Sequence, residues 1–259
     1  MDPATIIGIV LAFVALFGSM VLEGGNPASL FLPPAMMLIF IGTAGVSMAS
    51  NTMPGVIGSM KWMIYAMTAK KPDLDGVVEP LVKMAERARR EGLLALEAEM
   101  EAVTDPFMKR GLQMAVDGTD PDDLWEILSA EVKAKKISAK NGAKFWDDSG
   151  AYAPTLGVLG TVMGLVHVLE NLSQPDKLGH LIAGAFVATL WGVLSGNVLF
   201  FPLGKRIKAV GEAETARMEI IIDGVLAIQA GSNPRTVATK LRSKMAPVGP
   251  TAAEAKEAA

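Results

Sequence analysis

Tyr152 to Leu169 read YAPTLGVLGTVMGLVHVL, and Leu181 to Leu203 read LIAGAFVATLWGVLSGNVLFFPL. Neither stretch contains Asp, Glu, Lys or Arg. At about 1.5 Å per residue in a helix, each is long enough to span most or all of a hydrocarbon layer about 30 Å thick. Residues 170–179 join them. The two stretches therefore predict a hairpin of transmembrane helices.

A second pair of apolar segments lies near the N-terminus. Residues 6–22 and 30–60 contain no charged side chain, and the prolines and asparagine within the latter place its span near Ala35 to Met53. The short link Gly24 to Pro27 makes this pair another hairpin. Met1 to Thr5 lack the positive charge of a cleavable signal peptide, so we expect the first segment to be retained. The sequence thus predicts an all-α membrane protein with four transmembrane helices in two hairpins.

The basic residues predict the orientation of these spans. None of the 24 Lys and Arg residues precedes Lys61, 14 lie between Lys61 and Lys144, and nine follow from Lys205 to Lys256. Only Lys177 lies in the second hairpin link. By the positive-inside rule, the middle segment and the C-terminal region are cytoplasmic and the links face outward. We expect a multi-pass protein of the bacterial inner membrane with both termini in the cytoplasm.

The predicted organisation has five segments. They are a first transmembrane hairpin (1–60), a cytoplasmic helical domain (61–150), a second transmembrane hairpin (151–204), cytoplasmic C-terminal helices (205–245) and a disordered tail (246–259). Helical periodicity in the middle segment predicts several short helices, one of them capped by Asp120 before Leu124 to Lys136. Glu212 to Ala230 is expected to continue the fourth span as a charged helix, and Arg235 to Met245 to form a final short one.

Composition excludes several functions. A net charge of −3 and a pI near 5.5 give no basic field for nucleic acid. The absence of cysteine removes disulfides and thiol chemistry, and two histidines without a Gly-rich phosphate loop offer no catalytic constellation. The acids of residues 120–123 lack the ligand spacing of a calcium loop and are read as a helix cap. We expect no enzyme, no cofactor and no resident metal.

The spans themselves lack a group that could carry an ion by changing charge. His167 is their only ionisable side chain, and it lies about 23 Å from the inner end of its span, where an interface role is favoured over a relay. An ion pathway here would therefore need a titrating group from another chain.

Rows of small and hydroxyl residues run along the third and fourth spans. They are Gly157, Thr161 and Gly164 in one span, and Ala185, Thr189, Gly192 and Gly196 in the other. Such rows permit close helix packing within the hairpin. They could equally face a helix of another chain, with the hydroxyls of Thr161 and Thr189 offering oxygens to an ion. Pro154 and Pro202 free backbone carbonyls and permit bending at the inner ends of these spans.

The residues from Arg87 to Glu101 form a charged pattern in the middle segment. Positive charges precede Gly92 and negative charges follow it, so a bent pair of helices would expose opposite charges close together. Such a patch either recognises a partner with the complementary pattern or is a solvated face with local ion pairs.

Four segments resemble one known family. Residues 151–166 (AYAPTLGVLGTVMGLV) and 182–192 (IAGAFVATLWG) are similar to the third and fourth spans of MotA and PomA stator subunits, of the MotA/TolQ/ExbB family. Residues 89–97 (RREGLLALE) resemble the rotor-facing segment of these subunits and 231–235 (GSNPR) their C-terminal element. With four spans and a large loop after the second, the resemblance covers nearly the whole chain.

The resemblance implies an A subunit of the flagellar stator. Five copies would surround two single-span MotB-type chains whose Asp carries the ion, and ion flow would turn the ring against the rotor protein FliG. The site residues carried over by position are Arg89, Arg90 and Glu97 for rotor interaction, Pro154 and Pro202 for conformational coupling, and Thr189 for the pore.

The transported ion, H⁺ or Na⁺, is left open by the residues. Sodium-driven stators often have Thr at the position of Thr161 and proton-driven ones Ala, although proton-using ExbB and TolQ also have Thr; a hydroxyl oxygen there favours sodium. An ExbB/TolQ-like energiser of outer-membrane processes is the alternative, but those relatives have three spans and lack the arm of residues 6–22. A membrane scaffold without transport is a third hypothesis.

Overall fold

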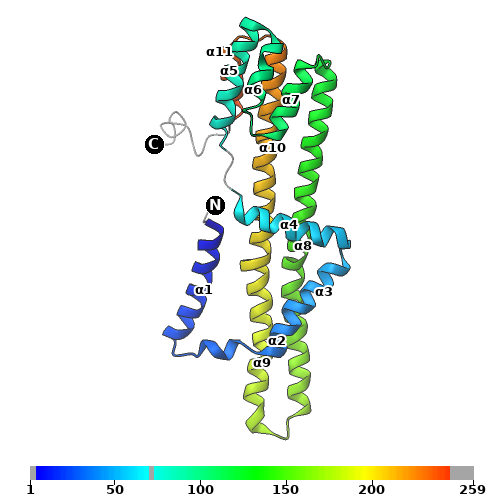
Figure 1. The fold of residues 1–259 in the computed structure, drawn as a ribbon. Helices are drawn as coiled ribbons and strands as arrows, with labels where there is room; N and C mark the ends of the chain where they lie inside the picture. Colours follow the sequence, from blue (N-terminus) through cyan, green and yellow to red (C-terminus); the bar gives the residue numbers. More distant parts are fainter. Residues whose placement is uncertain (1–3, 70–72, 246–259) are drawn as a thin grey trace, which may run out of the picture. The chain divides into compact units, whose positions relative to one another are not determined.

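The computed structural model describes residues 4–69 and 73–245, and every regular element in these ranges is helical, which confirms the predicted all-α fold. Two compact units share the chain: residues 4–69 with 137–211, called the first unit, and residues 73–136 with 212–245, called the second unit. Figure 1 shows the order of the helices along the chain. The predicted disorder of residues 246–259 lies outside the described residues, and the five predicted segments remain a prediction.

The first unit begins with the two predicted apolar arms. Its N-terminal elements are α1 (Ala4–Leu22), η1 (Pro27–Leu30), α2 (Pro33–Met36), η2 (Met37–Ile41), α3 (Gly42–Ala49) and α4 (Met53–Thr68). The elements α2, η2 and α3 follow one another without a break, and η2 is a π-helical turn. The predicted span to Met53 is wrong at its end, because the helix stops at Ala49. Thr52 then caps the new helix α4 by accepting a hydrogen bond from the Gly55 amide at 3.3 Å.

The second hairpin is built from two long helices. They are α8 (Pro121–Glu170), and α9 (Pro175–Leu194) continued by the π-helix η4 (Ser195–Phe200) and α10 (Phe201–Gln229). The predicted cap is confirmed, since Asp120 Oδ1 accepts from the Asp122 amide at 2.9 Å. The short helix expected to end at Lys136 is instead the start of α8, which runs on through the third span. Between Pro121 at its start and Pro154 the sequence of α8 has no proline, and Pro154 lies within the helix.

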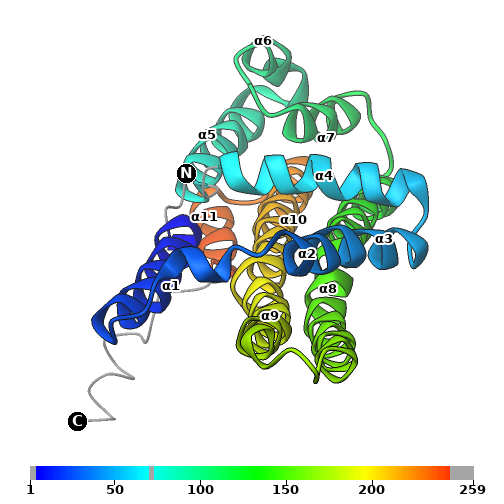
Figure 2. The same cartoon turned by 90° about the horizontal axis from the view of Figure 1, so that it is seen from below.

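Trp191 holds the first hairpin to α9. Its ring lies 5.6 Å from that of Phe31 and 5.9 Å from that of Phe40, and its indole N–H donates to the carbonyl of Leu30 at 2.7 Å. Helices α2 and α9 pack side by side, as Figure 2 also shows. Helix α1, in contrast, buries no residue within this chain. Phe13, Leu16 and Phe17 are partly buried against the cluster around Trp191, and the other apolar side chains of α1 are left for lipid or for another subunit.

Helix α4 packs on the parts of α8 and α10 nearest the ends of the spans. Ala66 of α4 shares a buried cluster with Phe145, Trp146 and Ile207. Trp62, from the same helix, lies directly over Gly142 and donates to the hydroxyl of Ser138 at 3.0 Å. These contacts connect the first hairpin to the second through α4.

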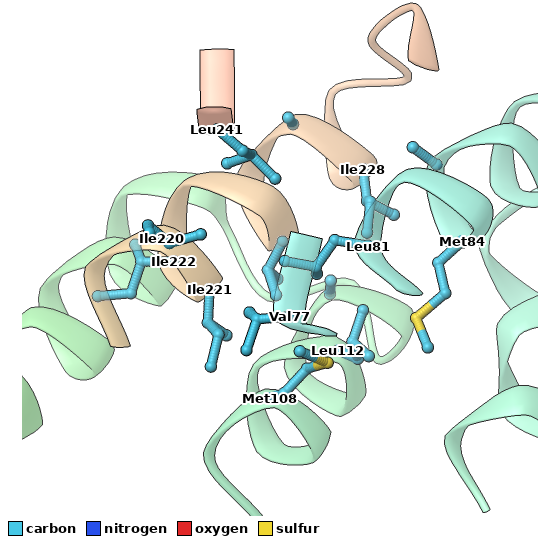
Figure 3. Close-up of a cluster of buried hydrophobic side chains, with 14 of the residues drawn as sticks. Val77, Leu81, Met84, Met108, Leu112, Ile220, Ile221, Ile222, Ile228 and Leu241 are labelled. Atoms are coloured by element: carbon cyan, nitrogen blue, oxygen red, sulfur yellow. The ribbon is translucent and has the colours of Figure 1, made fainter. Parts of the chain in front are cut away.

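The second unit is a helical bundle with its own core. It contains α5 (Asp75–Glu91), η3 (Leu93–Leu96), α6 (Glu97–Met100), α7 (Pro106–Val116), the start of α8, the end of α10 and α11 (Pro234–Ser243). The side chains of Leu81, Leu112, Ile221 and Leu241 are completely buried, and Figure 3 shows them converging from α5, α7, α10 and α11. The several short helices and the final helix predicted from the sequence are confirmed. This core holds α5 and α6, which carry the predicted rotor-facing charges.

Candidate functional site

The seam between α8 and α9 is closed by glycines. A Cβ atom on Gly192 would lie 2.6 Å from the Ala153 carbonyl oxygen and 2.9 Å from the Gly157 Cα. One on Gly157 would lie 3.1 Å from the Thr189 Cα, and one on Gly164 2.5 Å from the Ala185 Cβ. The two rows of small residues therefore pack against each other within the hairpin. Of the two interpretations that the sequence left open, this packing is the one present within the chain.

The same seam brings Thr161 and Thr189 together. Their hydroxyl groups are hydrogen-bonded to one another. Thr161 Oγ1 also lies 3.2 Å from the Gly157 carbonyl oxygen and 3.3 Å from that of Ala185, while Thr189 Oγ1 lies 3.1 Å from the Gly157 oxygen. Both threonine side chains are only half-buried. Two hydroxyl and two carbonyl oxygens thus converge at an accessible edge of the seam.

These four oxygens define what the site can do chemically. Two hydroxyls supply two protons for hydrogen bonds, whereas each oxygen retains lone pairs that can face a cation or a water molecule. No charged side chain lies in either apolar stretch of the hairpin. The arrangement can therefore help replace part of the hydration shell of an ion, or position water, but it has no titrating group of its own.

Pro154 and Pro202 both lie beside the irregular part of the continuous helix formed by α9, η4 and α10. Gly196 lies in the π-helix η4, and a Cβ atom placed on it would lie 3.1 Å from the Pro154 Cδ. Pro202 follows η4 by two residues and cannot donate a backbone hydrogen bond to the turn before it. The sequence predicted bending at both prolines but not the π-helix, where the backbone hydrogen-bond ladder is already altered.

His167 lies apart from the paired threonines. It is near the end of α8, largely exposed, with its Nδ1 3.3 Å from Glu170 Oε2. No hydrogen bond that the structure records among the described residues joins it to Thr161 or Thr189. The interface role predicted for His167 stays a prediction.

A polar cluster that the sequence did not predict fixes the corner between α3 and α4. Lys144 Nζ on α8 donates to the Ser50 carbonyl oxygen at 3.2 Å, to Asn51 Oδ1 at 3.1 Å and to Asp148 Oδ2 at 3.0 Å. Asn51 Nδ2 donates to the same carboxylate oxygen of Asp148 at 2.8 Å. The available signals were the lone Asn51 in an apolar stretch and the Lys–Asp pair four residues apart, which do not by themselves identify a shared partner.

In the second unit, the predicted bent pair of helices with opposite charges is confirmed. Gly92 ends α5 with φ of +84°, a conformation that favours glycine, and the chain then turns into η3. Arg87 donates to Glu99 Oε1 at 2.8 Å and to Glu91 Oε2 at 3.1 Å. These hydrogen bonds, that to Glu99 first, raise the pKa of the Arg87 guanidinium above its usual value. Arg87 therefore closes the turn.

The three predicted rotor-facing residues are arranged around this turn. Arg89, Arg90 and Glu97 are all exposed. Arg90 lies 3.9 Å from Glu86, a loose contact along one helix. Within the described residues, no ion pair holds Arg89 or Glu97. Their charges are directed to solvent, where a partner can reach them.

The fold and the seam define a class: an all-helical membrane protein in which an uncharged pair of apolar helices presents clustered oxygens. Comparison with known proteins supports this class. Residues 99–220 match the family model described as MotA/TolQ/ExbB proton channel family, and residues 6–92 match that of Motility protein A N-terminal.

Individual relatives specify the family further. Motility protein A of Bacillus subtilis (strain 168) is 40% identical over 242 residues, covering 93% of this chain and 90% of the relative. The structure of C. jejuni MotAB aligns with a TM-score of 0.92 at 30% identity, covering 96% of this chain and 98% of that one. The flagellar MotAB stator complex from Bacillus subtilis aligns with a TM-score of 0.87 at 36% identity, covering 97% and 98%. The chain belongs to the Motility protein A family.

Proposed function

We propose that this chain, a flagellar stator ion-channel subunit by its family, lines an ion path with Thr161 and Thr189 beside a MotB-type partner that supplies the titrating Asp. The observation that carries the proposal is the pairing of the two hydroxyls at a half-buried edge of spans without charge. Such an edge can complete an ion site but cannot bind and release the ion by itself. The similar solved structures, which contain both MotA and MotB, support the need for the second chain.

The proposed topology has four spans and cytoplasmic termini in the bacterial inner membrane. Among the described residues, three helices are long and apolar enough to cross a membrane by length and composition: Ala4–Leu22, and the helices covering residues 121–170 and 175–229. The shorter apolar helix Pro33–Ala49 would supply the fourth span. At about 1.5 Å per residue its 17 residues reach about 26 Å, slightly less than a typical hydrocarbon core. The distribution of basic residues supports the orientation.

In the proposed mechanism, the protein converts ion occupancy into movement of helices. Neutralisation of the partner Asp by the ion changes the interactions at the threonine edge. The π-helix η4 and its two neighbouring prolines form the weakest part of the hairpin, so a change at the seam would be taken up there. Helices α8 and α10 run from the hairpin into the second unit. Several copies, five by family resemblance, would turn together around two MotB-type chains.

The second unit would deliver this movement to the rotor. Arg89 and Glu97, with Arg90 beside them, are exposed charges on a closed turn and fit a docking surface for the rotor protein FliG. Reversing the charge of Arg89 or Glu97 should weaken torque, and a compensating reversal on the rotor should restore part of it. Full torque in both single reversals would remove this surface from the mechanism. We assign the chain no enzymatic activity and no cofactor.

The role of the threonine edge is tested by variants of Thr189 that separate the effect of side-chain shape from the effect of the hydroxyl group. Thr189→Val keeps the branched shape and removes the oxygen, whereas Thr189→Ser keeps the oxygen. We expect the valine variant to lose most ion flux and swimming, and the serine variant to retain both. A scaffold without transport predicts equal swimming in the two variants. Immunoblots of membrane fractions would verify that both variants are inserted at equal levels.

The coupling ion is tested in a stator-deficient strain that carries this chain and its MotB-type partner. Swimming speed is recorded against external sodium at fixed proton-motive force. We propose sodium coupling from the Thr161 oxygen, so speed should rise with sodium and Thr161→Ala should weaken that dependence. Speed independent of sodium would refute sodium coupling.

The alternative, an ExbB/TolQ-like energiser of outer-membrane processes, is less supported. The described α1 and the match of residues 6–92 to the Motility protein A N-terminal model both favour the flagellar role. Restoration of swimming in the stator-deficient strain separates the two functions, since an energiser would leave the cells non-motile.

A further inference from the structure

Leu94 is an apolar side chain held out into solvent in the middle of the charged turn. It is 71% exposed, more than any other large hydrophobic side chain in the described part of the second unit. Leu96, two residues later in the same 3₁₀ turn, is completely buried, and Leu93 packs against the same core. The exposure of Leu94 therefore does not come from a loose loop. Its neighbours hold the turn in place while Leu94 points away.

The turn that carries Leu94 is closed on both sides. Gly92 reverses the chain before it, and Arg87 bridges α5 to Glu99 of α6 at 2.8 Å behind it. A side chain on such a closed turn loses little conformational freedom when a partner covers it. Leu94 thus has the rigidity expected of an interface anchor rather than of an incidental surface leucine.

Charges of opposite sign flank this apolar position. Arg89 and Arg90 precede the turn, and Glu97 follows Leu94 by three residues as the C-terminal cap of the same 3₁₀ turn. An apolar centre with a charged rim is the usual composition of a protein–protein hot spot: the centre contributes affinity and the rim contributes steering and orientation.

We propose that Leu94 is the apolar anchor of the rotor-docking surface. It would insert into an apolar pocket of the rotor protein whose rim carries acidic groups opposite Arg89 and Arg90 and a basic group opposite Glu97. The inference rests on the proposed function, because it assigns the central contact of the surface that the charges define. Removing the leucine side chain from a buried contact lowers an association constant about tenfold or more.

The test uses the full chain with its MotB-type partner in stator-deficient cells, comparing Leu94→Ser, Leu94→Met and the control Ile127→Ser. Ile127 is also an exposed apolar residue of the second unit, 53% exposed on α8. Torque is measured on beads attached to single flagella, and ion flux in membranes without rotors. We expect Leu94→Ser to engage the rotor about tenfold more weakly with unchanged flux, Leu94→Met to recover most torque, and Ile127→Ser to be normal.

Three results would overturn the proposal. Full torque with Leu94→Ser, while charge reversals at Arg89 or Glu97 reduce torque, would refute the anchor and leave the rotor surface intact. Reduced ion flux with Leu94→Ser in membranes without rotors would show that the residue acts through the channel. If the charge reversals and Leu94→Ser all give full torque, the proposed rotor surface fails together with its anchor.

Discussion

Replacing Gly192 by alanine tests the close approach of α8 and α9. The added Cβ would lie 2.6 Å from the Ala153 carbonyl oxygen and 2.9 Å from the Gly157 Cα. Both contacts are to backbone, so no side-chain rotation can relieve them and the helices must separate. Overpacking of this kind costs about 1–3 kcal/mol, and the upper part of that range applies here. Alanine regains up to about 1 kcal/mol through its helix propensity.

The net loss expected for Gly192→Ala is therefore about 1–2 kcal/mol. Gly45→Ala is the matched control, because a Cβ at Gly45 in α3 would meet nothing within 4 Å and should only gain helix propensity. Gly157→Ala is intermediate, since its contacts are 3.1 Å or longer. In SDS-induced unfolding of the purified complex, Gly192→Ala should be the least stable variant, Gly157→Ala intermediate and Gly45→Ala the most stable. Separation of the helices should also reduce ion flux.

Equal stability of the variants at Gly192 and Gly45 would refute the reasoning, because it would mean that the backbones do not meet at the seam. A loss of stability with wild-type ion flux would be equally informative. It would show that the pairing of the threonines does not depend on this close packing.

Three further predictions concern other contacts. Trp191→Phe should destabilise the complex by about 1–3 kcal/mol, because the Leu30 carbonyl loses its indole donor at 2.7 Å. Trp146→Phe should cost less, because the indole hydrogen bond of Trp146 is longer, at 3.4 Å. SDS-induced unfolding compares the two variants. Leu112→Ala should cost about 2–5 kcal/mol by thermal unfolding, since that side chain is fully buried. Arg87→Gln should lower torque but not ion flux. Arg87→Lys should restore little torque, because the contact with two glutamates needs the guanidinium fork. Full torque in Arg87→Gln would contradict this prediction.

Much of the fold could be predicted because its signals are local. Blocks without charge located the apolar helices, the Asp120 cap located the start of α8, and the Gly-Ser-Asn-Pro stop at residues 231–234 separated α10 from α11. The errors occurred at ends. The helix predicted to reach Met53 stops at Ala49, and α8 continues where a short helix was expected. Such boundaries depend on packing against neighbouring helices, which a one-dimensional pattern does not contain.

The candidate site was predictable to a similar degree. Thr161 and Thr189 were identified from their helical spacing, but their mutual hydrogen bond follows from the register of two helices, which glycine contacts set. The π-helix beside Pro202 has no clear signature in the residues. Likewise, the charge pattern around Gly92 predicted opposite charges close together. The pattern could not show that Arg87 forms the internal bridge to Glu99 while Arg89 stays available to a partner.

The central claim is that this chain forms one half of an ion pathway and needs a carboxylate from a second chain. Ion flux into liposomes tests it most directly, with this chain alone, with the MotB-type partner, and with a partner whose span Asp is replaced by Asn. We predict flux only with the unaltered partner. Flux through this chain alone, or with the Asn partner at the unaltered rate, would contradict the account.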